Sequence, residues 1–189
     1  YNTLDMVAWI SRDKGVTEVA DIAVSLSQMM RYTIKGTAMT DLKAELEHIR
    51  HYLTIQKLRD GDRITFIVQS PEELMGFRLP KLVIQPLVEN AIIHGLDGCA
   101  NGYICIYAAQ KDGILRISVT DDGCGMGQEM LDWMNSPNPA KRDGHLGLYN
   151  VIQILKLYYG EEYGIQAESD TSGTTVTIRL PAKKEAPHV

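Results

Sequence analysis

The sequence has few cysteines, no excess of basic residues and no long apolar run. Its three cysteines, Cys99, Cys105 and Cys124, form no C-x-x-C pair, which argues against a disulfide framework or a zinc knuckle and agrees with a reducing compartment. Lysine plus arginine number 19 and aspartate plus glutamate 24, so the net charge of −5 argues against a nucleic-acid partner. The most apolar stretch, residues 79–96, is interrupted by polar side chains, so no membrane span is expected.

Two apolar stripes with helical spacing lie in the first third of the chain. The first consists of Val19, Ile22, Leu26 and Met29, and the second of Leu42, Leu46, Ile49 and Leu53. Each stripe predicts an amphipathic helix, and residues 1–14 show a further helical pattern. Gly36 favours a turn between the stripes, which predicts an antiparallel helical hairpin, and Thr40 is the expected N-cap of the second helix.

The pattern changes near residue 61 to strands and helices in alternation. Strands are expected over residues 64–68, 103–108, 114–120, 164–168 and 174–180, and helices over residues 80–95 and 146–159. Asp112-Gly113 predicts a hairpin turn, and Pro86 is expected to kink its helix. Residues 126–145 lack periodicity and predict a mobile loop. The sequence therefore predicts an α+β fold in which a helical hairpin precedes an α/β sandwich with antiparallel strand pairing.

Three clusters in the second part of the chain carry chemistry, and the first is Glu89-Asn90 with His94. Asn90 and His94 are four residues apart, so they share a helix face, and Glu89 lies beside it. A carboxylate, an amide oxygen and an imidazole in this arrangement suit a hydrated Mg²⁺ and its phosphates, because Mg²⁺ keeps waters and takes few protein ligands. The alternative is a polar helix face in solvent.

The second cluster centres on Asp121. The period of two in the preceding strand places Asp121 on the same buried face as the apolar residues, where a carboxylate needs hydrogen-bond donors such as the amino group of a nucleotide base. Gly123 and Gly125 permit a close approach of the backbone or a positive φ. Thr174 has the strand parity to face the same buried side. The alternative is a turn in which Asp121 accepts hydrogen bonds from local amides.

The third cluster is a pair of glycines, Gly144 and Gly147, at the start of a helix. Free amides at a helix N-terminus bind phosphate through their N–H groups and the helix dipole. The alternative is a closely packed helix start. Taken in order, the three clusters and the Gly-Thr strand resemble the N, G1 and G2 boxes of the Bergerat ATP-binding fold, which sensor histidine kinases, DNA gyrase, MutL and the ninety-kilodalton chaperones share. This resemblance covers residues 62–181.

The first third of the chain narrows the resemblance to the LytS/YesM-type sensor kinases. Tyr1-Asn2-Thr3-Leu4-Asp5 looks like the continuation of their phosphoacceptor motif. Further segments similar to that family are Met30-Arg31-Tyr32, Glu45-Leu46, Tyr52-Leu53-Thr54-Ile55-Gln56 and Gln85-Pro86-Leu87-Val88-Glu89-Asn90-Ala91. The resemblance implies a helical dimerisation and phosphotransfer region at residues 1–60. It also implies an ATP-binding catalytic domain at residues 61–183, a Bergerat-type sandwich with a mixed, largely antiparallel sheet packed on helices, and a tail at residues 184–189.

The resemblance also implies roles for individual residues. Asn90 would hold Mg²⁺ across the ATP phosphates, with Glu89 and His94 as orienting or proton-handling groups, and Asp121 would read the adenine amino group with the support of Thr174. The remaining implied roles are Gly123 and Gly125 as floor and hinge of a lid over residues 126–145, Gly144 and Gly147 as amide donors to the phosphates, and Lys141 and Arg142 as candidate contacts of the γ-phosphate. For Lys141 and Arg142 a solvated basic pair is the alternative.

The function implied by the resemblance is that of the cytoplasmic kinase core of a two-component sensor kinase. A homodimer would transfer the γ-phosphoryl group of ATP to a histidine and then to an aspartate of a response regulator, for which the AraC type is one candidate. The acceptor histidine would lie three residues before Tyr1, so the chain is expected to be a piece of a longer, membrane-anchored protein and to bind ATP without phosphorylating itself. His48 and His51 are expected on a solvated helix face, and His188 in the tail.

Two other functions stay open on the sequence. One is an ATPase of the gyrase or MutL kind, which needs a carboxylate one helical turn before Asn90 to activate water. Pro86 stands at that position, with Gln85 as a neighbour that could compensate in the metal shell. The other is a non-catalytic dimerisation module whose sandwich binds nucleotide weakly or not at all.

Overall fold

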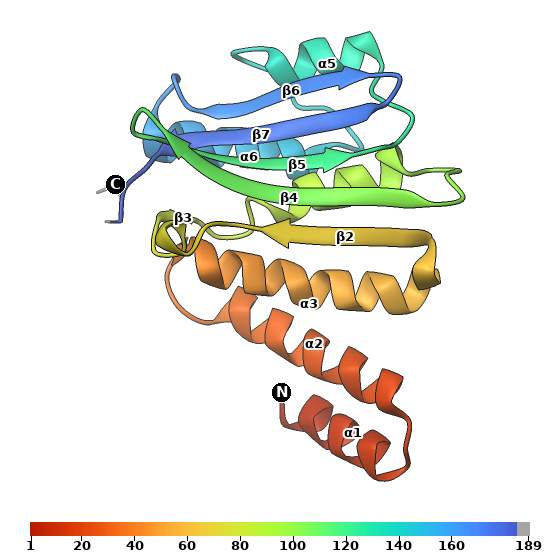
Figure 1. Ribbon diagram of the computed structural model, residues 1–189. Helices are drawn as coiled ribbons and strands as arrows, with labels where there is room; N and C mark the ends of the chain where they lie inside the picture. Colours follow the sequence, from red (N-terminus) through yellow and green to blue (C-terminus); the bar gives the residue numbers. More distant parts are fainter. Residues whose placement is uncertain (185–189) are drawn as a thin grey trace.

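The computed structural model describes residues 1–184, and its architecture is three successive helices followed by an α/β sandwich (Figure 1). The two stripes expected to pair as a hairpin lie in the second and third of these helices, which contact each other. The expected tail beyond residue 184, with His188, lies outside the described residues. The helices are α1 (Asn2–Asp13), α2 (Thr17–Ile34), α3 (Leu42–Asp60), α4 (Gln85–Asn90), α5 (Gln128–Asn135) and α6 (Leu146–Tyr159), with short helical turns η1 (Gly61–Arg63), η2 (Glu72–Leu74) and η3 (Ala91–Gly95). The strands are β1 (Met39–Asp41), β2 (Ile64–Gln69), β3 (Arg78–Pro80), β4 (Gly102–Lys111), β5 (Ile114–Asp121), β6 (Gly164–Asp170) and β7 (Gly173–Pro181).

The main sheet has five strands in the order β2-β4-β5-β7-β6, and β2 and β4 run parallel while the other pairs are antiparallel. The predicted α+β class and the largely antiparallel sheet are therefore confirmed. Asp112 (φ 51°) and Gly113 (φ 75°) make the predicted turn between β4 and β5, because two left-handed residues match the twist of a hairpin. Helices α4 and α6 lie behind the sheet in Figure 1, and α5 covers the β6 edge.

The core forms where the inward side chains of the sheet meet these helices. In β5 and β7 every second residue points inward, and Leu115, Ile117 and Leu180 are fully buried. The α3 stripe, Leu42 to Leu53, joins the same cluster of buried side chains. Because α3 lies alongside β2 and also contacts α2, both of its sides are covered (Figure 1). For this reason His48, which was expected on a solvated face, is only 3% exposed; that prediction is wrong.

Three further expectations about local structure are corrected. Thr40 does not cap α3: it lies in β1 opposite Leu79 of β3, and the Asp41 carboxylate accepts the capping hydrogen bond from the Ala44 amide at 2.8 Å. The helix expected from residue 80 begins at Gln85, so Pro86 lies in its first turn. The N–H that proline lacks would be unpaired there in any case, so Pro86 removes no hydrogen bond from the helix.

The loop expected over residues 126–145 contains a helix. Residues 128–135 form α5, which packs its Met134 into the core at 1% exposure. The Asn135 side chain pairs with the backbone of Ala167 in β6, accepting from its N–H and donating to its carbonyl, both at 2.9 Å. Met130, Leu131 and Trp133 of α5 are partly buried against the same core. An eight-residue helix has only about two turns in which such a pattern can repeat.

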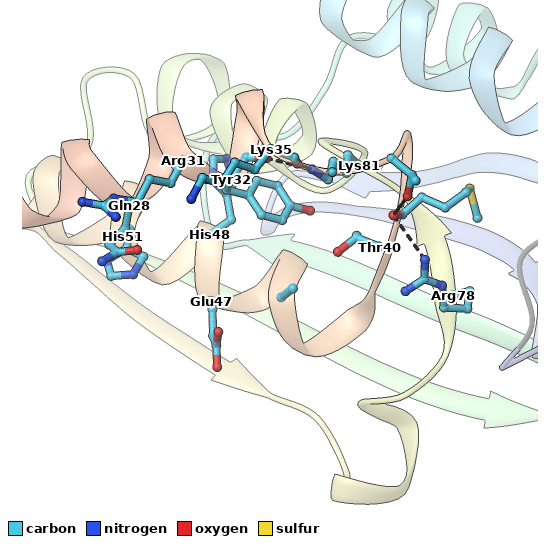
Figure 2. Close-up of a pocket in the computed structure, with 14 residues that line it drawn as sticks. Gln28, Arg31, Tyr32, Lys35, Thr40, Glu47, His48, His51, Arg78 and Lys81 are labelled. Carbon is cyan, nitrogen blue, oxygen red and sulfur yellow. Dashed lines mark hydrogen bonds between the residues drawn. The ribbon is translucent and has the colours of Figure 1, made fainter. Parts of the chain in front are cut away.

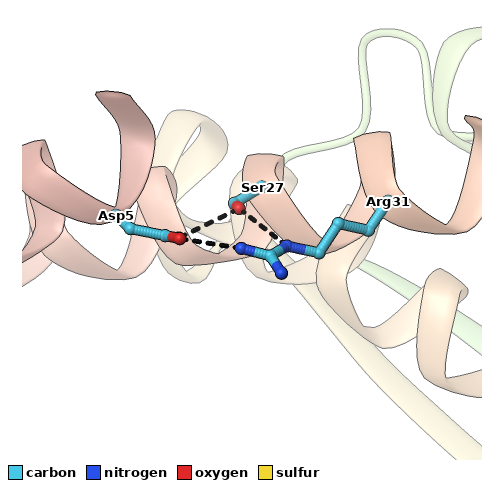
Figure 3. A network of polar contacts seen from close by, with 3 residues as sticks. All are labelled: Asp5, Ser27 and Arg31. Carbon is cyan, nitrogen blue, oxygen red and sulfur yellow. Dashed lines mark hydrogen bonds and ion pairs between the residues drawn. The ribbon is translucent and has the colours of Figure 1, made fainter. Parts of the chain in front are cut away.

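The α1–α2 hairpin has a different kind of interior. Its buried cluster consists of Ala8, Ala20 and Ala23. The first three residues of the predicted α2 stripe face outward, with Val19 43% and Leu26 40% exposed, whereas Met29 is partly buried against the sandwich core. Polar contacts cross the hairpin: the Asp5 carboxylate accepts hydrogen bonds from the Ser27 hydroxyl at 3.1 Å and the Arg31 guanidinium at 2.7 Å (Figure 3). Among the described helices, none combines the length and apolar composition that crossing a bilayer requires.

Candidate functional site

Asp121 ends β5 with a buried carboxylate. Its side chain is 4% exposed, and the register of β5 with β7 places Thr174, also 4% exposed, directly opposite. The Oδ1 atom accepts a hydrogen bond from the Gly123 amide at 3.0 Å. Loss of hydration raises the pKa of Asp121, and hydrogen bonds from the Gly123 and Thr174 amides act in the opposite direction. The expected buried placement of the two side chains on one face is thus observed.

The carboxylate lies against the end of η3, where backbones come very close. A Cβ added to Gly95 would lie 2.7 Å from the Asp121 carboxylate, and one added to Gly123 would lie 1.8 Å from the Gly95 carbonyl oxygen. That carbonyl accepts a hydrogen bond from the Cys124 amide at 3.0 Å. The φ of Gly123 lies outside the left-handed region, so this close approach alone is the reason that a glycine is required there.

Gly125 is required for two reasons. Its φ is +78°, and a Cβ would lie 2.1 Å from the carbonyl oxygen of Asp170 in the β6–β7 turn. The next amide, Met126 N–H, donates to the Ser169 hydroxyl at 2.7 Å, and that hydroxyl is 3.0 Å from the Thr174 hydroxyl. The position predicted as a hinge is thus fastened to the β6–β7 turn beside Asp121.

Two adjoining cavities connect the predicted clusters. The first, of about 220 Å³, is lined by Asp121, Thr174 and Gly125 together with Met126 and Met130. The second, of about 100 Å³, is lined by Glu89, Gly144 and Gly147 together with Pro86 and Leu148. Asn90, His94 and His145 line both cavities. A larger cavity, of about 560 Å³, lies apart from these residues, between α2 and α3.

Asn90 is the last residue of α4, and the following turn is wider than an α-helical turn. In η3 the Leu96 amide donates to the Ala91 carbonyl five residues earlier, at 2.9 Å. Asn90 and His94 still line the same space, as their spacing predicted. The Glu89 carboxylate faces the smaller cavity and accepts a hydrogen bond from the Gln85 side-chain amide at 2.7 Å.

His145 is a site residue that the sequence reasoning missed. Its ring lies 5.4 Å from the ring of His94 and 6.2 Å from that of Trp133, so it stands where the two cavities meet. Desolvation is the main cause that lowers the pKa of His145, and the charges of His94 and Arg142 lower it further. The available signal was its place inside the Gly144–Gly147 motif, where only the glycines were considered.

The glycine pair lies at the smaller cavity, whereas the two basic residues before it do not line it. Gly144 has φ +81° and precedes the N-cap of α6, and a Cβ on Gly147 would lie 3.2 Å from the Pro86 ring. Arg142 pairs with the Glu129 carboxylate of α5 at 3.0 Å, and Lys141 is exposed. The cavity walls include the glycines but neither basic residue.

The side chains present suit a nucleotide with a divalent cation. In the part of the chain that the structure describes, no three His, Cys, Asp or Glu side chains are grouped as a metal site. Mg²⁺ accompanying a phosphate ligand needs only one or two protein oxygens, and Asn90 offers a side-chain oxygen at the wall of the smaller cavity, beside Glu89. The buried Asp121 acceptor in the adjoining cavity suits the amino group of a base.

Comparisons with known proteins show the family to which the chain belongs. Residues 1–64 match the family model described as histidine kinase, and residues 77–184 match that of histidine kinase-, DNA gyrase B- and HSP90-like ATPases. The chain is 31% identical to the sensor histidine kinase YesM of Bacillus subtilis and 30% identical to the sensor protein LytS of Oceanobacillus iheyensis, over 98% and 96% of its length. It spans 31% and 32% of the lengths of these two relatives.

Solved structures show the same fold. The histidine kinase domain of a blue-light activated kinase from Erythrobacter litoralis superposes with a TM-score of 0.56 at 20% identity, over 96% of this chain and 83% of that one. Histidine kinase ThkA, solved in complex with the response regulator protein TrrA, superposes with a TM-score of 0.53 at 19% identity, over 90% of this chain and 51% of that one. At these identities the likeness shows a shared fold.

Proposed function

Because the chain belongs to the sensor histidine kinases of the LytS and YesM type, with a catalytic domain of the histidine kinase-, DNA gyrase B- and HSP90-like ATPases, we propose that its sandwich binds Mg-ATP for phosphoryl transfer to a histidine. The single observation that carries the proposal is the buried Asp121 carboxylate at the wall of a cavity, opposite Thr174. In that position Asp121 would accept a hydrogen bond from the adenine amino group, with Thr174 in support.

The phosphates would lie in the smaller cavity. Gly144 and Gly147 would present backbone N–H groups at the start of α6, where the helix dipole favours negative charge. Asn90 would ligate Mg²⁺, and Glu89 and His94 would orient the metal-bound water or the phosphates. When bound, Mg²⁺ would neutralise charge on the transferring phosphoryl group.

The segment over residues 126–145 would act as a lid that hinges beside Gly125. In the described conformation it is attached to the rest of the domain: the Asn135 side chain pairs with the backbone of Ala167 in β6, and Lys156 of α6 donates to the Asn138 side chain at 2.9 Å. His145 separates the two cavities, so its side chain would turn away to admit a whole nucleotide. Opening the Arg142–Glu129 pair would free Arg142, with Lys141, to reach the γ-phosphate.

The helical part would supply dimerisation and access to the acceptor. The exposed apolar residues of α1 and α2, among them Trp9 at 69% and Ile22 at 38%, would pack against a second copy in a homodimer. Residues 1–60 would then form the dimerisation and phosphotransfer region and residues 61–183 the catalytic domain, although the buried face of α3 continues into the sandwich core.

In the proposed reaction an imidazole nitrogen attacks the γ-phosphorus, the bond to the β-phosphate oxygen breaks, and ADP leaves. His48 is buried, and His94 and His145 line the nucleotide cavities, so we assign the acceptor to none of these. The resemblance implies an acceptor in the motif that Tyr1-Asn2-Thr3-Leu4-Asp5 continues, and neither His51 nor His188 stands in that motif. The chain by itself would therefore bind Mg-ATP without phosphorylating itself. The phosphoryl group would pass on to an aspartate of a response regulator, the kind of partner with which ThkA was solved, in a protein held at the cytoplasmic side of the membrane.

A gyrase-type ATPase is less well supported. It needs a carboxylate one turn before Asn90, and Pro86 occupies that place and packs on Gly147. A dimerisation module without nucleotide binding would leave the buried Asp121 carboxylate unexplained, since burial of a charge is unfavourable without a compensating role.

Calorimetric titration of Mg-ATP into the wild type and two matched variants tests the proposal. Asp121→Asn replaces one carboxylate oxygen, a hydrogen-bond acceptor, with an NH₂ group, a donor. It should weaken Mg-ATP binding at least about tenfold, or about 1.4 kcal/mol. Asp122→Asn is the control, because Asp122 is exposed and accepts only from the Tyr103 amide, at 2.6 Å. Equal affinities of all three proteins, or no binding by a folded wild type, would contradict the nucleotide site.

A further inference from the structure

A chain of side-chain hydrogen bonds runs from α3 to the smaller cavity. His48 Nε2 of α3 lies 2.6 Å from Gln85 Oε1 at the start of α4, and Gln85 Nε2 lies 2.7 Å from Glu89 Oε1 one turn later. His48 is buried at 3% exposure, and Glu89 reaches the cavity that Asn90 lines. A group on the helical side of the molecule is therefore connected to the site through two short contacts.

The chemistry of the three side chains determines which atom donates in each of the two hydrogen bonds. An ionised Glu89 carboxylate can only accept, so the Gln85 NH₂ group must face it. The Gln85 carbonyl oxygen then faces His48, and His48 Nε2 must carry the proton. His48 Nδ1 is buried and has no hydrogen-bond partner among the described residues, so a proton on Nδ1 would be an unsatisfied buried donor.

Tyr32 of α2 holds the other side of His48. The two rings stack with centroids 4.5 Å apart and planes 26° apart, and both line the cavity between α2 and α3 (Figure 2). The Tyr32 hydroxyl donates to the buried Glu45 carboxylate, which also accepts from the Leu82 and Ile84 amides at 3.0 and 3.1 Å. Burial, and then the Glu45 charge, raise the pKa of Tyr32, so the hydroxyl remains a donor.

Lys81 fastens the end of α2 to the same place. Its ammonium donates to the Tyr32 carbonyl at 2.8 Å and lies 4.8 Å from the centre of the Tyr32 ring. The last turn of α2 is thereby attached to the segment that leads directly into α4. A change in the seating of α2 on α3 would move the Tyr32 ring against His48.

We propose that His48 and Gln85 are positioning residues that hold the Glu89 carboxylate at the phosphate cavity, and that Tyr32 makes this placement depend on how α2 sits on α3. The proposal rests on the proposed function, because Glu89 acts there only if Mg-ATP binds beside Asn90. Without the Gln85 donor, the carboxylate can rotate about its side-chain bonds and spends less time directed at the site. The helical part would in this way regulate the nucleotide site without touching the nucleotide.

The first experiment reads the hydrogen bonds without nucleotide. Nitrogen-15 spectra of labelled histidine should show the Nε2-protonated tautomer of His48, and Glu89→Ala should shift the His48 Nε2 resonance although the two side chains do not touch. Glu129→Ala, an exposed site on α5, is the control and should leave that resonance in place. The proposal is overturned if His48 is the tautomer protonated at Nδ1 alone, or if its Nε2 resonance does not shift in Glu89→Ala.

The second experiment is a double-mutant cycle on Mg-ATP affinity. Gln85→Leu should weaken binding about fivefold in the wild-type background and leave it unchanged in the Glu89→Ala background, because the two residues act as one unit. The control is Gln56→Leu, which removes a buried glutamine of α3 that takes no part in the His48–Gln85–Glu89 hydrogen bonds. It should leave the affinity for Mg-ATP unchanged. Additive effects would show that Gln85 only stabilises the fold and would overturn the proposal. A folded wild type that does not bind Mg-ATP overturns the proposed function itself.

Rescue variants separate positioning from folding. His48→Gln offers an N–H near the position of Nε2 and should keep most of the affinity, whereas His48→Leu should lose as much as Gln85→Leu. Tyr32→Phe keeps the stacked ring and should match the wild type in affinity even if the loss of its hydroxyl lowers stability, and Tyr32→Leu should weaken binding. Equal affinities of the two Tyr32 variants would remove α2 from the proposal.

Discussion

The α1–α2 hairpin and the sandwich use the same helical patterns in opposite ways. In the sandwich the large aliphatic side chains are inside: Leu42 and Ile49 of α3 and Leu155 of α6 are completely buried. In the hairpin the small residues are inside, and large ones such as Trp9 and Met6 are 69% and 61% exposed. The sandwich therefore has a core of its own, while large apolar side chains of the hairpin stay exposed in the single chain.

The difference shows what an apolar stripe does and does not predict. The stripes of α2 and α3 have equivalent spacing, and both helices form where the spacing places them. The α3 stripe is buried and the α2 stripe is exposed except at Met29, because spacing tells which residues share a face and not what covers that face. Each of the following variants is a way to break or sharpen this contrast, and they are ordered from the largest effect to the smallest.

Truncation in the core should have the largest effect on stability. Leu115→Ala in β5 removes a fully buried side chain and should lower the free energy of unfolding by about 3 kcal/mol, since the vacated volume cannot collapse inside a packed sheet. Urea unfolding followed by circular dichroism measures the change. The matched variant is Leu26→Ala in α2, where the side chain is 40% exposed. It should cost less than about 1 kcal/mol in dilute solution and instead weaken self-association in sedimentation experiments. Similar losses from both variants would contradict the contrast.

A methyl group at Gly123 should have the next largest effect. Gly123→Ala drives a Cβ to within 1.8 Å of the Gly95 carbonyl oxygen, so the end of β5 and the end of η3 must separate, at about 2 kcal/mol. Gly127→Ala is the control, because a Cβ there meets no atom within 4 Å. Thermal unfolding compares the two. A Gly123→Ala protein as stable as Gly127→Ala would mean that the two backbones are not in contact.

Asp121→Asn should stabilise the protein while it weakens nucleotide binding. Burial raises the folded-state pKa of Asp121 above the unfolded value, so between these two pKa values the folded state holds more protons, and stability falls as the pH rises through that window. The ionised carboxylate therefore costs stability at neutral pH, and asparagine avoids this cost. The advantage of the variant should disappear below the unfolded pKa, which urea unfolding at several pH values measures. A variant less stable than wild type at neutral pH would refute this.

Loss of the Asp5–Arg31 ion pair should have the smallest effect. The pair is 2.7 Å long but lies at the surface, with its side chains 51% and 34% exposed (Figure 3). Asp5→Asn should lower stability by less than about 1 kcal/mol, and the difference from wild type should shrink in high salt as the charges are screened. An effect as large as that of Leu115→Ala would mean that the hairpin is held by charge rather than by its apolar surface.

The sequence predicted the site best where the period of a strand settles the direction of a side chain. Asp121 and Thr174 were placed on one face by a period of two, and they lie opposite each other across β5 and β7. Asn90 and His94 were likewise brought together by helical spacing. These residues follow from local geometry, and their burial follows from the apolar neighbours on the same face.

The sequence did not predict the features of the site that depend on tertiary contacts. The burial of His48 depends on α2 and α3 packing together, and the direction of Gln85 depends on Glu89 and His48 at once. The position of His145 depends on a contact with Trp133 of α5, a helix too short to be recognised. None of these contacts leaves a periodic signal in the residues that make it.

The parallel pairing of β2 with β4 has a consequence for the rate of folding. The hairpin of β4 and β5 closes through the two residues 112 and 113, whereas β2 and β4 pair only after the chain between residues 69 and 102, with Glu89 and Asn90, has been laid down. Closing the longer loop costs more entropy before its contacts form, so we expect this pairing late, after the folding transition state. Substitutions in β2 should then mainly accelerate unfolding, and the phosphate cavity should be the last part of the site to assemble.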